Sequence, residues 1–319
     1  MLNLLLDNLL NPALLFFLMG ILAVSFKSDL SIPDSSSKFI SLYLLFSIGF
    51  NGGRELNHSE FTPDMIYTII FSVLLSLIIP IYVFFFVKKR LGVHNAGAIA
   101  ASYGSVSAVT FVTAVSFLQM YSLSFDGYMV ASLAFMEAPA IIMGVMLTRY
   151  FGKMKKEGDN IGKIIKHSML NGSVVLILGS LLIGLLSNET QAMDIQPFTT
   201  DIFKGFLAVF LLDMGLQAGR KLKSFFKNGW FTILSAIGFS LINGIIVGIL
   251  SGFFMDDIGN RFLITILGAS ASYIAVPAAM RISMPKADAG IYLPMALAVS
   301  FPFNITIGFP IYYWIVNFF

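Results

Sequence analysis

The sequence GSVSAV at residues 104–109 has a counterpart in ASASYI at residues 269–274. Each stretch lies near the middle of a long apolar run. Small residues allow a helix to unwind, and serine hydroxyls can hydrogen-bond the backbone groups that unwinding frees. We therefore expect a discontinuous helix at each stretch, at matching positions of an internal repeat.

Three further pairs of segments support this repeat. They are Leu10-Asn11 with Leu170-Asn171, GFNGGREL (49–56) with GLQAGRKL (215–222) and, more weakly, Pro139 with Pro302. All four pairs occur in the same order, at an offset of about 160 to 166 residues. One such pair could arise by chance, but four ordered pairs indicate a duplicated unit.

The composition places this repeat in a membrane. Of 319 residues, 57% are hydrophobic and only 12% are charged, with a mean hydropathy of +0.85. Soluble domains have about 25% charged residues, and a membrane helix needs about 20 apolar residues. Long unbroken apolar runs favour helices over a barrel. We predict an all-α polytopic membrane protein with ten spans, at 9–26, 38–54, 65–87, 95–119, 127–149, 168–187, 198–219, 229–254, 260–283 and 288–317.

The positions of the basic residues predict the orientation. With ten spans and both termini outside, seventeen of the twenty lysines and arginines fall in inside loops, as the positive-inside rule requires. Five spans per unit, an odd number, place the second unit upside down. The predicted organisation is a first repeat at 1–150, a basic cytoplasmic loop at 151–167 and an inverted second repeat at 168–319. Such repeats are typical of secondary transporters.

The paired serine motifs are the main candidate binding site. A broken helix exposes N–H groups at the start of its second half, where the helix dipole also favours an anion. The carbonyl end of the first half favours a cation. Inverted repeats would bring the two breaks together, so that one pocket could hold an anion and a sodium ion. The alternative is close helix packing through small residues.

Polar residues inside the fifth and tenth spans are candidate ion ligands. Glu137 is an acid within a span, which marks it as a functional candidate. It could coordinate sodium, carry a proton, pair with a base or be a buried structural acid. Ser300 is its repeat counterpart, and Asn304 is either an ion ligand or an interhelical hydrogen-bond partner. Ser107 and Ser272 complete the predicted sodium site.

Two arginines end the shared GxxxGR motifs at opposite membrane faces. Arg54 and Arg220 either anchor the helix ends at the interface or take part in gating. Pro277 lies in the ninth span, whereas the fourth span has Val112 at the aligned position. The two breaks are therefore not expected to be equivalent.

Other functional classes lack their signatures. There is no cysteine, so disulfides, thiol catalysis and cysteine metal sites are excluded. The three histidines are scattered, and there is no HExxH, phosphate loop or GxSxG motif. We expect no enzyme, no cofactor and no metal site other than the coupling sodium ion. A net charge of +3 gives no reason to expect nucleic acid as a partner.

At these residues the sequence resembles the sodium-dependent bicarbonate permeases of the SbtA type. The resembling stretches are 11–33, 41–56, 100–114, 129–147 and 268–294. The resemblance implies ten spans as two inverted repeats, with crossing broken helices four and nine, and a core and a gate domain. It implies that the family's substrate-binding positions fall here on Gly104, Ser105, Val106, Ser107, Ala108, Ser270, Ala271, Ser272 and Tyr273.

The resemblance also implies a sodium-coupled symporter that imports bicarbonate into bacteria across the inner membrane, as a homotrimer. Cyanobacterial members are inhibited by a PII-like cytoplasmic partner. The loop between spans five and six is shorter here than in those members, which argues against such a partner. Alternatives are symport of another small anion, sodium–proton antiport through Glu137, and a channel lined by the broken helices.

Overall fold

The computed structural model describes residues 2–58, 62–152, 166, 170–225 and 229–319. The structure is 84% helical, and the described residues contain no strand. Six helical segments in this part of the chain are long and apolar enough to cross a membrane, and three shorter apolar helices accompany them. The prediction of an all-helical polytopic membrane protein is confirmed at this level. Most of the predicted basic loop at 151–167 lies outside the described residues.

The helices follow one another in chain order with short connections. The elements are α1 (Leu2–Leu9), α2 (Pro12–Ser25), α3 (Asp34–His58), α4 (Pro63–Leu91), α5 (Val93–Gly104), α6 (Ala108–Met120), α7 (Tyr128–Phe151), α9 (Gly172–Leu186), α10 (Glu189–Gln196), η1 (Pro197–Asp201), α11 (Phe203–Phe225), α12 (Trp230–Ser251), α13 (Ile258–Ala269), α14 (Ala275–Ser283), α15 (Ala289–Pro294), η3 (Met295–Ser300), α16 (Phe301–Phe303), η4 (Asn304–Gly308) and α17 (Phe309–Phe318).

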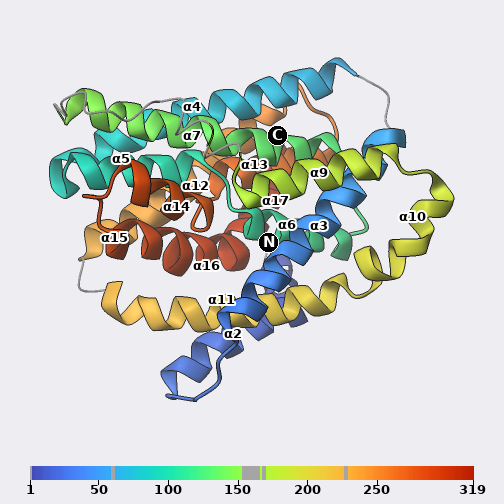
Figure 1. The fold of residues 1–319 in the computed structure, drawn as a ribbon, viewed down its shortest axis with the longest axis horizontal. Helices are drawn as coiled ribbons and strands as arrows, with labels where there is room; N and C mark the ends of the chain where they lie inside the picture. Colours follow the sequence, from blue (N-terminus) through green and yellow to red (C-terminus); the bar gives the residue numbers. More distant parts are fainter. Residues whose placement is uncertain (1, 59–61, 153–165, 167–169, 226–228) are drawn as a thin grey trace.

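Two bundles of helices make up the structure. In the first bundle, α2 packs along α11 and α3 packs along α9. In the second bundle, α4, α5 and α7 pack together, and α12 packs with α13 and with the segment from η3 to α17. Figure 1 shows α4 along one edge of the molecule and α2 with α11 along the opposite edge, with α5, α13 and α14 between them.

Glycines bring the helices of the first bundle into close contact. A Cβ added to Gly20 would overlap the backbone of α11, and one added to Gly215 would overlap the backbone of α2. Gly53 and Gly184 stand in the same relation between α3 and α9. Such small residues let helix backbones approach closely within a membrane.

The matched Leu-Asn pairs have the same local role. The side chain of Asn11 accepts a hydrogen bond from the backbone N–H of Ala13 at 2.9 Å, and starts α2. Asn171 accepts one from Ser173 at 3.0 Å, and starts α9. Asparagine is a favourable N-cap because its side chain satisfies a backbone N–H that has no partner within the helix. The motif therefore marks where a helix begins.

Both expected helix breaks are present. The first break, residues 105–107, separates α5 from α6, and the second break, residues 270–274, separates α13 from α14. The second break is longer, so the two are not equivalent. Pro277 lies in the first turn of α14, where its missing N–H would have had no helical partner. It therefore removes no hydrogen bond within α14.

The last helical segment contains two π-helical stretches. η3 ends at Ser300 and η4 begins at Asn304. Wider turns of this kind inside α-helices occur frequently at functional sites. Two of the predicted sodium ligands therefore lie at irregular points of the final helix rather than in a regular one.

Candidate binding site at the paired helix breaks

The two breaks are joined by hydrogen bonds. The backbone N–H of Ser272 donates to the carbonyl oxygen of Ser102 at 2.8 Å, which links the second break to the last turn of α5. In the opposite direction, the N–H of Ser107 donates to Ser270 Oγ at 3.1 Å, and this hydroxyl donates to the carbonyl of Leu267 at 3.2 Å. Leu267 is the repeat counterpart of Ser102. The N–H of Ser272 thus bonds directly to the α5 carbonyl, whereas the N–H of Ser107 reaches the equivalent α13 carbonyl through the hydroxyl of Ser270.

This relay gives a testable difference between two matched serines. Ser270 Oγ serves two partners, whereas Ser105 Oγ, at the equivalent position, is buried without a hydrogen-bond partner among the described residues. Ser270→Ala leaves two buried backbone groups unpaired, at a cost of about 1–3 kcal/mol. We expect it to lower the thermal unfolding midpoint of the purified protein clearly more than Ser105→Ala does. Equal midpoints would contradict the relay.

The starts of α6 and α14 present backbone N–H groups at the breaks. Ser107 Oγ accepts from the N–H of Thr110 at 3.1 Å and so caps α6. The N–H groups of Ala108 and Val109, in the first turn, have no partner within that helix by geometry. The first turn of α14 begins at Ala275, without a side-chain cap, and its first N–H groups likewise have no partner within the helix. Together with the helix dipoles, these groups form a favourable environment for an anion.

A narrow cavity of about 20 Å³ joins both breaks to Glu137. Its lining comes from the first break and α6, from α7, from the second break and α14, and from the first bundle: Val106, Ser107, Ala108, Glu137, Ser272, Tyr273, Ile274, Ala275, Leu45 and Ser173. The volume suits about one water molecule. Six of the predicted site residues therefore meet where the two bundles face each other.

Glu137 contributes an unsatisfied buried oxygen to this cavity. Its side chain is 7% exposed, and Oε1 has no hydrogen-bond partner among the described residues. A buried carboxylate is costly unless it is paired, coordinated or protonated. The position is therefore chemically suited to a cation.

Ser300 and Asn304 do not line the narrow cavity, and their polar groups are engaged elsewhere. Ser300 Oγ lies 2.7 Å from the hydroxyl of Tyr103 and donates to the carbonyl of Ala236 at 3.0 Å. Asn304 Nδ2 donates to the carbonyl of Ala269 at 3.0 Å, at the end of α13. The bond of Asn304 is the interhelical hydrogen bond that was its alternative interpretation. Their part in sodium binding stays a prediction.

The remaining predicted residues lie in or directly beside the breaks but outside the cavity lining. Ser105, Ser270 and Ala271 are buried. Gly104 ends α5, and a Cβ there would overlap the ring of Pro80 in α4. Close packing through small residues therefore operates at Gly104.

A wide cavity of about 680 Å³ opens farther along the boundary between the bundles, and the sequence did not indicate it. It lies beside the C-terminal ends of α3 and α6, with Ile48, Asn51, Arg54, Val115 and Gln119 in its wall. One turn back, Leu44 of α3 and Val112 of α6 line a gap of about 10 Å³ that shares Leu45 and Ala108 with the narrow cavity. Apolar side chains therefore separate the wide cavity from the breaks.

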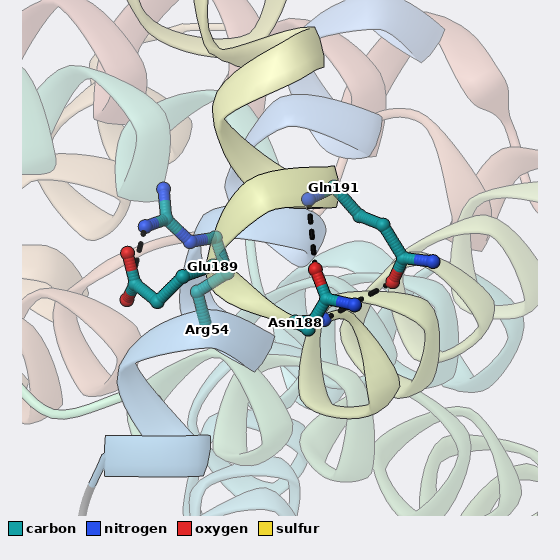
Figure 2. A network of polar contacts seen from close by, with 4 residues as sticks. All are labelled: Arg54, Asn188, Glu189 and Gln191. Atoms are coloured by element: carbon teal, nitrogen blue, oxygen red, sulfur yellow. Dashed lines mark hydrogen bonds and ion pairs between the residues drawn. The ribbon is translucent and has the colours of Figure 1, made fainter.

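Arg54, at the rim of the wide cavity, is held by an ion pair. Figure 2 shows its guanidinium facing Glu189 in the first turn of α10, at 3.8 Å. Beside it, Asn188 and Gln191 form a capping box that fixes the start of α10. Arg220 instead donates to the carbonyl of Leu30 at 3.3 Å. Each arginine thus ties a helix end to a neighbouring segment, and both anchoring at the membrane interface and gating stay predictions.

Comparison with known families decides what kind of molecule has this site. The family model described as the Na⁺-dependent bicarbonate transporter superfamily matches residues 12–317. The chain belongs to this family. A search of the curated proteins finds no match. Membership in the Na⁺-dependent bicarbonate transporter superfamily fits the membrane-spanning helices, and it points to transport rather than catalysis.

Proposed function

We propose that the chain is a symporter that imports bicarbonate with sodium across the bacterial inner membrane by alternating access. The observation that carries this proposal is the narrow cavity, where both helix breaks meet Glu137 at the boundary between the bundles. Family membership supplies the sodium and the bicarbonate. The homotrimer belongs to the same proposal and rests on the family resemblance alone.

The proposed architecture is ten spans in two inverted repeats, 1–150 and 168–319, with both termini outside. Matched contacts support it. Gly20 of α2 meets Gly215 of α11, and at the repeat-equivalent crossing Ser180 of α9 meets Gly49 of α3. The hydrogen bonds between the breaks are matched in the same way. Each contact made by one repeat therefore has a counterpart at the equivalent positions of the other repeat.

The chemistry of the narrow cavity suits a small monovalent anion together with a cation. Because its volume of about 20 Å³ has room for about one water molecule, the cavity would have to widen as the bundles move to admit bicarbonate. Among the described residues, its lining contains no arginine or lysine, and a dicarboxylate or phosphate would more naturally call for an arginine clamp. Bicarbonate would bind at the N–H groups that start α6 and α14. Sodium would bind at Glu137 with Ser107 and Ser272, and so neutralise the carboxylate next to the anion.

The position of this site between the two bundles supports alternating access. The first bundle would act as the gate and the second as the core, with rigid motion of one against the other exposing the site to each side in turn. The wide cavity would be the outward vestibule. Leu44 and Val112 separate it from the breaks, so the path from this side would be closed in this conformation.

The test is uptake of labelled bicarbonate into proteoliposomes that contain the purified protein. We expect uptake to require an inward sodium gradient, to saturate and to accumulate bicarbonate above its external concentration. Uptake that is independent of sodium would refute symport, and equilibration without accumulation would indicate a channel. Competition by other small anions in the same assay identifies the cargo.

Sodium–proton antiport is a second candidate, because Glu137 Oε1 is buried without a partner among the described residues. A carboxylate in that position can titrate during a transport cycle. A sodium gradient that moves protons in the absence of bicarbonate would favour antiport over symport.

A further inference from the structure

Two asparagines occupy equivalent positions at the far ends of the broken helices. Asn95 is the third residue of α5, and Asn260 is the third residue of α13. Each lies about three turns before its break, at the opposite end of the helix from the narrow cavity. Neither residue belongs to the repeated motifs, and neither lines a cavity described above.

Each asparagine accepts a hydrogen bond from an aspartate of the other repeat. The backbone N–H of Asp126 donates to Asn260 Oδ1 at 2.8 Å, and that of Asp288 donates to Asn95 Oδ1 at 2.7 Å. The two aspartates are themselves equivalent. The carbonyl of Asp126 accepts from the N–H of Met129, and that of Asp288 accepts from Ile291, both at 3.0 Å. Each aspartate thus opens the last helical segment of its own repeat.

The two contacts differ in how strongly they are reinforced. Asn260 is 2% exposed, and its Nδ2 donates to Asp126 Oδ2 at 2.6 Å and to the hydroxyl of Tyr128 at 3.0 Å. A Cβ at the neighbouring Gly259 would overlap the carbonyl of Ser124, so the two segments are in close contact. Asn95 is only partly buried, and its Nδ2 donates at 2.9 Å to the carbonyl of Leu91, the last residue of α4, and not to Asp288.

We propose that Asn95 and Asn260 are matched positioning residues, each of which ties the outer end of a broken helix to the last segment of the opposite repeat. Each asparagine contact holds one end of α5 or α13, and the break lies at the other end. The two contacts together therefore fix how far α5 and α13 extend toward each other. The contact sets the register of Ser107 against Ser272. The inference rests on the proposed function for its effect on transport, but not for the contacts themselves.

The experiment compares sodium-dependent bicarbonate uptake by Asn95→Ala, Asn260→Ala and the control Asn317→Ala, per amount of folded protein. Asn317 donates only within its own helix, to Tyr313 at 2.7 Å, and is exposed. We expect the first two variants to raise the sodium concentration for half-maximal uptake about fivefold, as loss of a hydrogen bond of about 1 kcal/mol would. The control should leave it unchanged. A contact that only stabilised the fold would lower the amount of folded protein and not this concentration.

A double variant in which Asn260 and Asp126 exchange side-chain types keeps the test valid if an alanine variant fails to fold. Asn260→Asp places two carboxylates against each other, and adding Asp126→Asn restores an amide–carboxylate pair. We expect the double variant to recover most of the sodium dependence that Asn260→Asp loses. Wild-type behaviour of both alanine variants, or a double variant no better than Asn260→Asp, would overturn the proposal.

Amide hydrogen exchange separates this inference from the proposed function. Asn260→Ala should speed exchange at the Asp126 amide, and Asn95→Ala should speed it at Asp288, whether or not the protein transports bicarbonate. If wild-type protein showed no sodium-dependent uptake, the proposed function would fail. The exchange rates of these two amides would still test whether the asparagine contacts form. Unchanged protection of both amides would refute them.

Discussion

Replacing Glu137 with glutamine is expected to lower sodium-driven bicarbonate uptake by at least about 100-fold. The substitution keeps the size of the side chain and removes the charge that faces the narrow cavity. A carboxylate and a sodium ion about 4 Å apart attract by about 4 kcal/mol in a protein environment of intermediate dielectric. Loss of that attraction removes most of the sodium affinity. The measurement is the initial rate of uptake in proteoliposomes under a fixed sodium gradient.

Asp213→Asn is the matched control for Glu137→Gln. Asp213 is also a buried acid, but Oδ2 accepts hydrogen bonds from Ser37 and, at 2.8 Å, from Gln217, and it lines none of the cavities described above. Its variant should retain sodium dependence. Normal transport by Glu137→Gln at every pH would exclude both the sodium role and the proton role of this residue.

The thermal stability of the Glu137→Gln variant distinguishes a binding residue from a structural one. Without sodium, the wild-type carboxylate has an oxygen that no described residue satisfies, so glutamine should leave the unfolding midpoint unchanged or raise it. Sodium should stabilise the wild type, because a ligand that binds only the folded state adds stability. It should have little effect on the variant. A structural acid would show the reverse, with a variant less stable in all conditions.

Removing the hydroxyls of Ser107 and Ser272 is expected to have the second-largest effect. Both serines line the narrow cavity, one from each break. We expect Ser272→Ala to raise the sodium concentration for half-maximal uptake at least about tenfold, since each lost interaction of a hydroxyl with a charged ligand is worth about 1.5–3 kcal/mol. Ser107→Ala should have a similar effect and also destabilise the protein, because Ser107 caps α6.

Ser72→Ala is the control for this pair. Ser72 is fully buried in α4, and its hydroxyl donates only to the carbonyl of Thr68, within the same helix, at 2.7 Å. Uptake by this variant should match the wild type. If Ser107→Ala and Ser272→Ala also matched it, the serine motifs would serve helix packing alone.

The position of the breaks could be predicted from sequence because the signal is local. Small residues and serines inside an apolar run indicate either a helix break or close helix packing, and their recurrence at a fixed offset favoured the break. The same holds for Asn11 and Asn171, which cap helices at equivalent positions. A helix start depends on the capping side chain and on the residues directly after it.

Features that depend on how distant helices meet could not be predicted. Sequence places Ser300 and Asn304 at a suitable depth, but helix periodicity cannot follow them through η3 and η4, where the turns widen. The relay through Ser270 requires knowing that Ser107 faces it from the other repeat. The contacts of Asn95 and Asn260 join loops to helices more than 130 residues away.

The central claim is that one cavity holds bicarbonate and sodium together, so binding of each must strengthen binding of the other. Thermodynamic linkage requires the two effects to be equal in size. The most direct measurement is bicarbonate affinity of the purified protein in sodium and in choline, paired with sodium affinity with and without bicarbonate. We predict that each ligand tightens the other by the same factor, about tenfold or more, and that Glu137→Gln abolishes this coupling. Equal bicarbonate affinity in sodium and in choline would contradict a shared site.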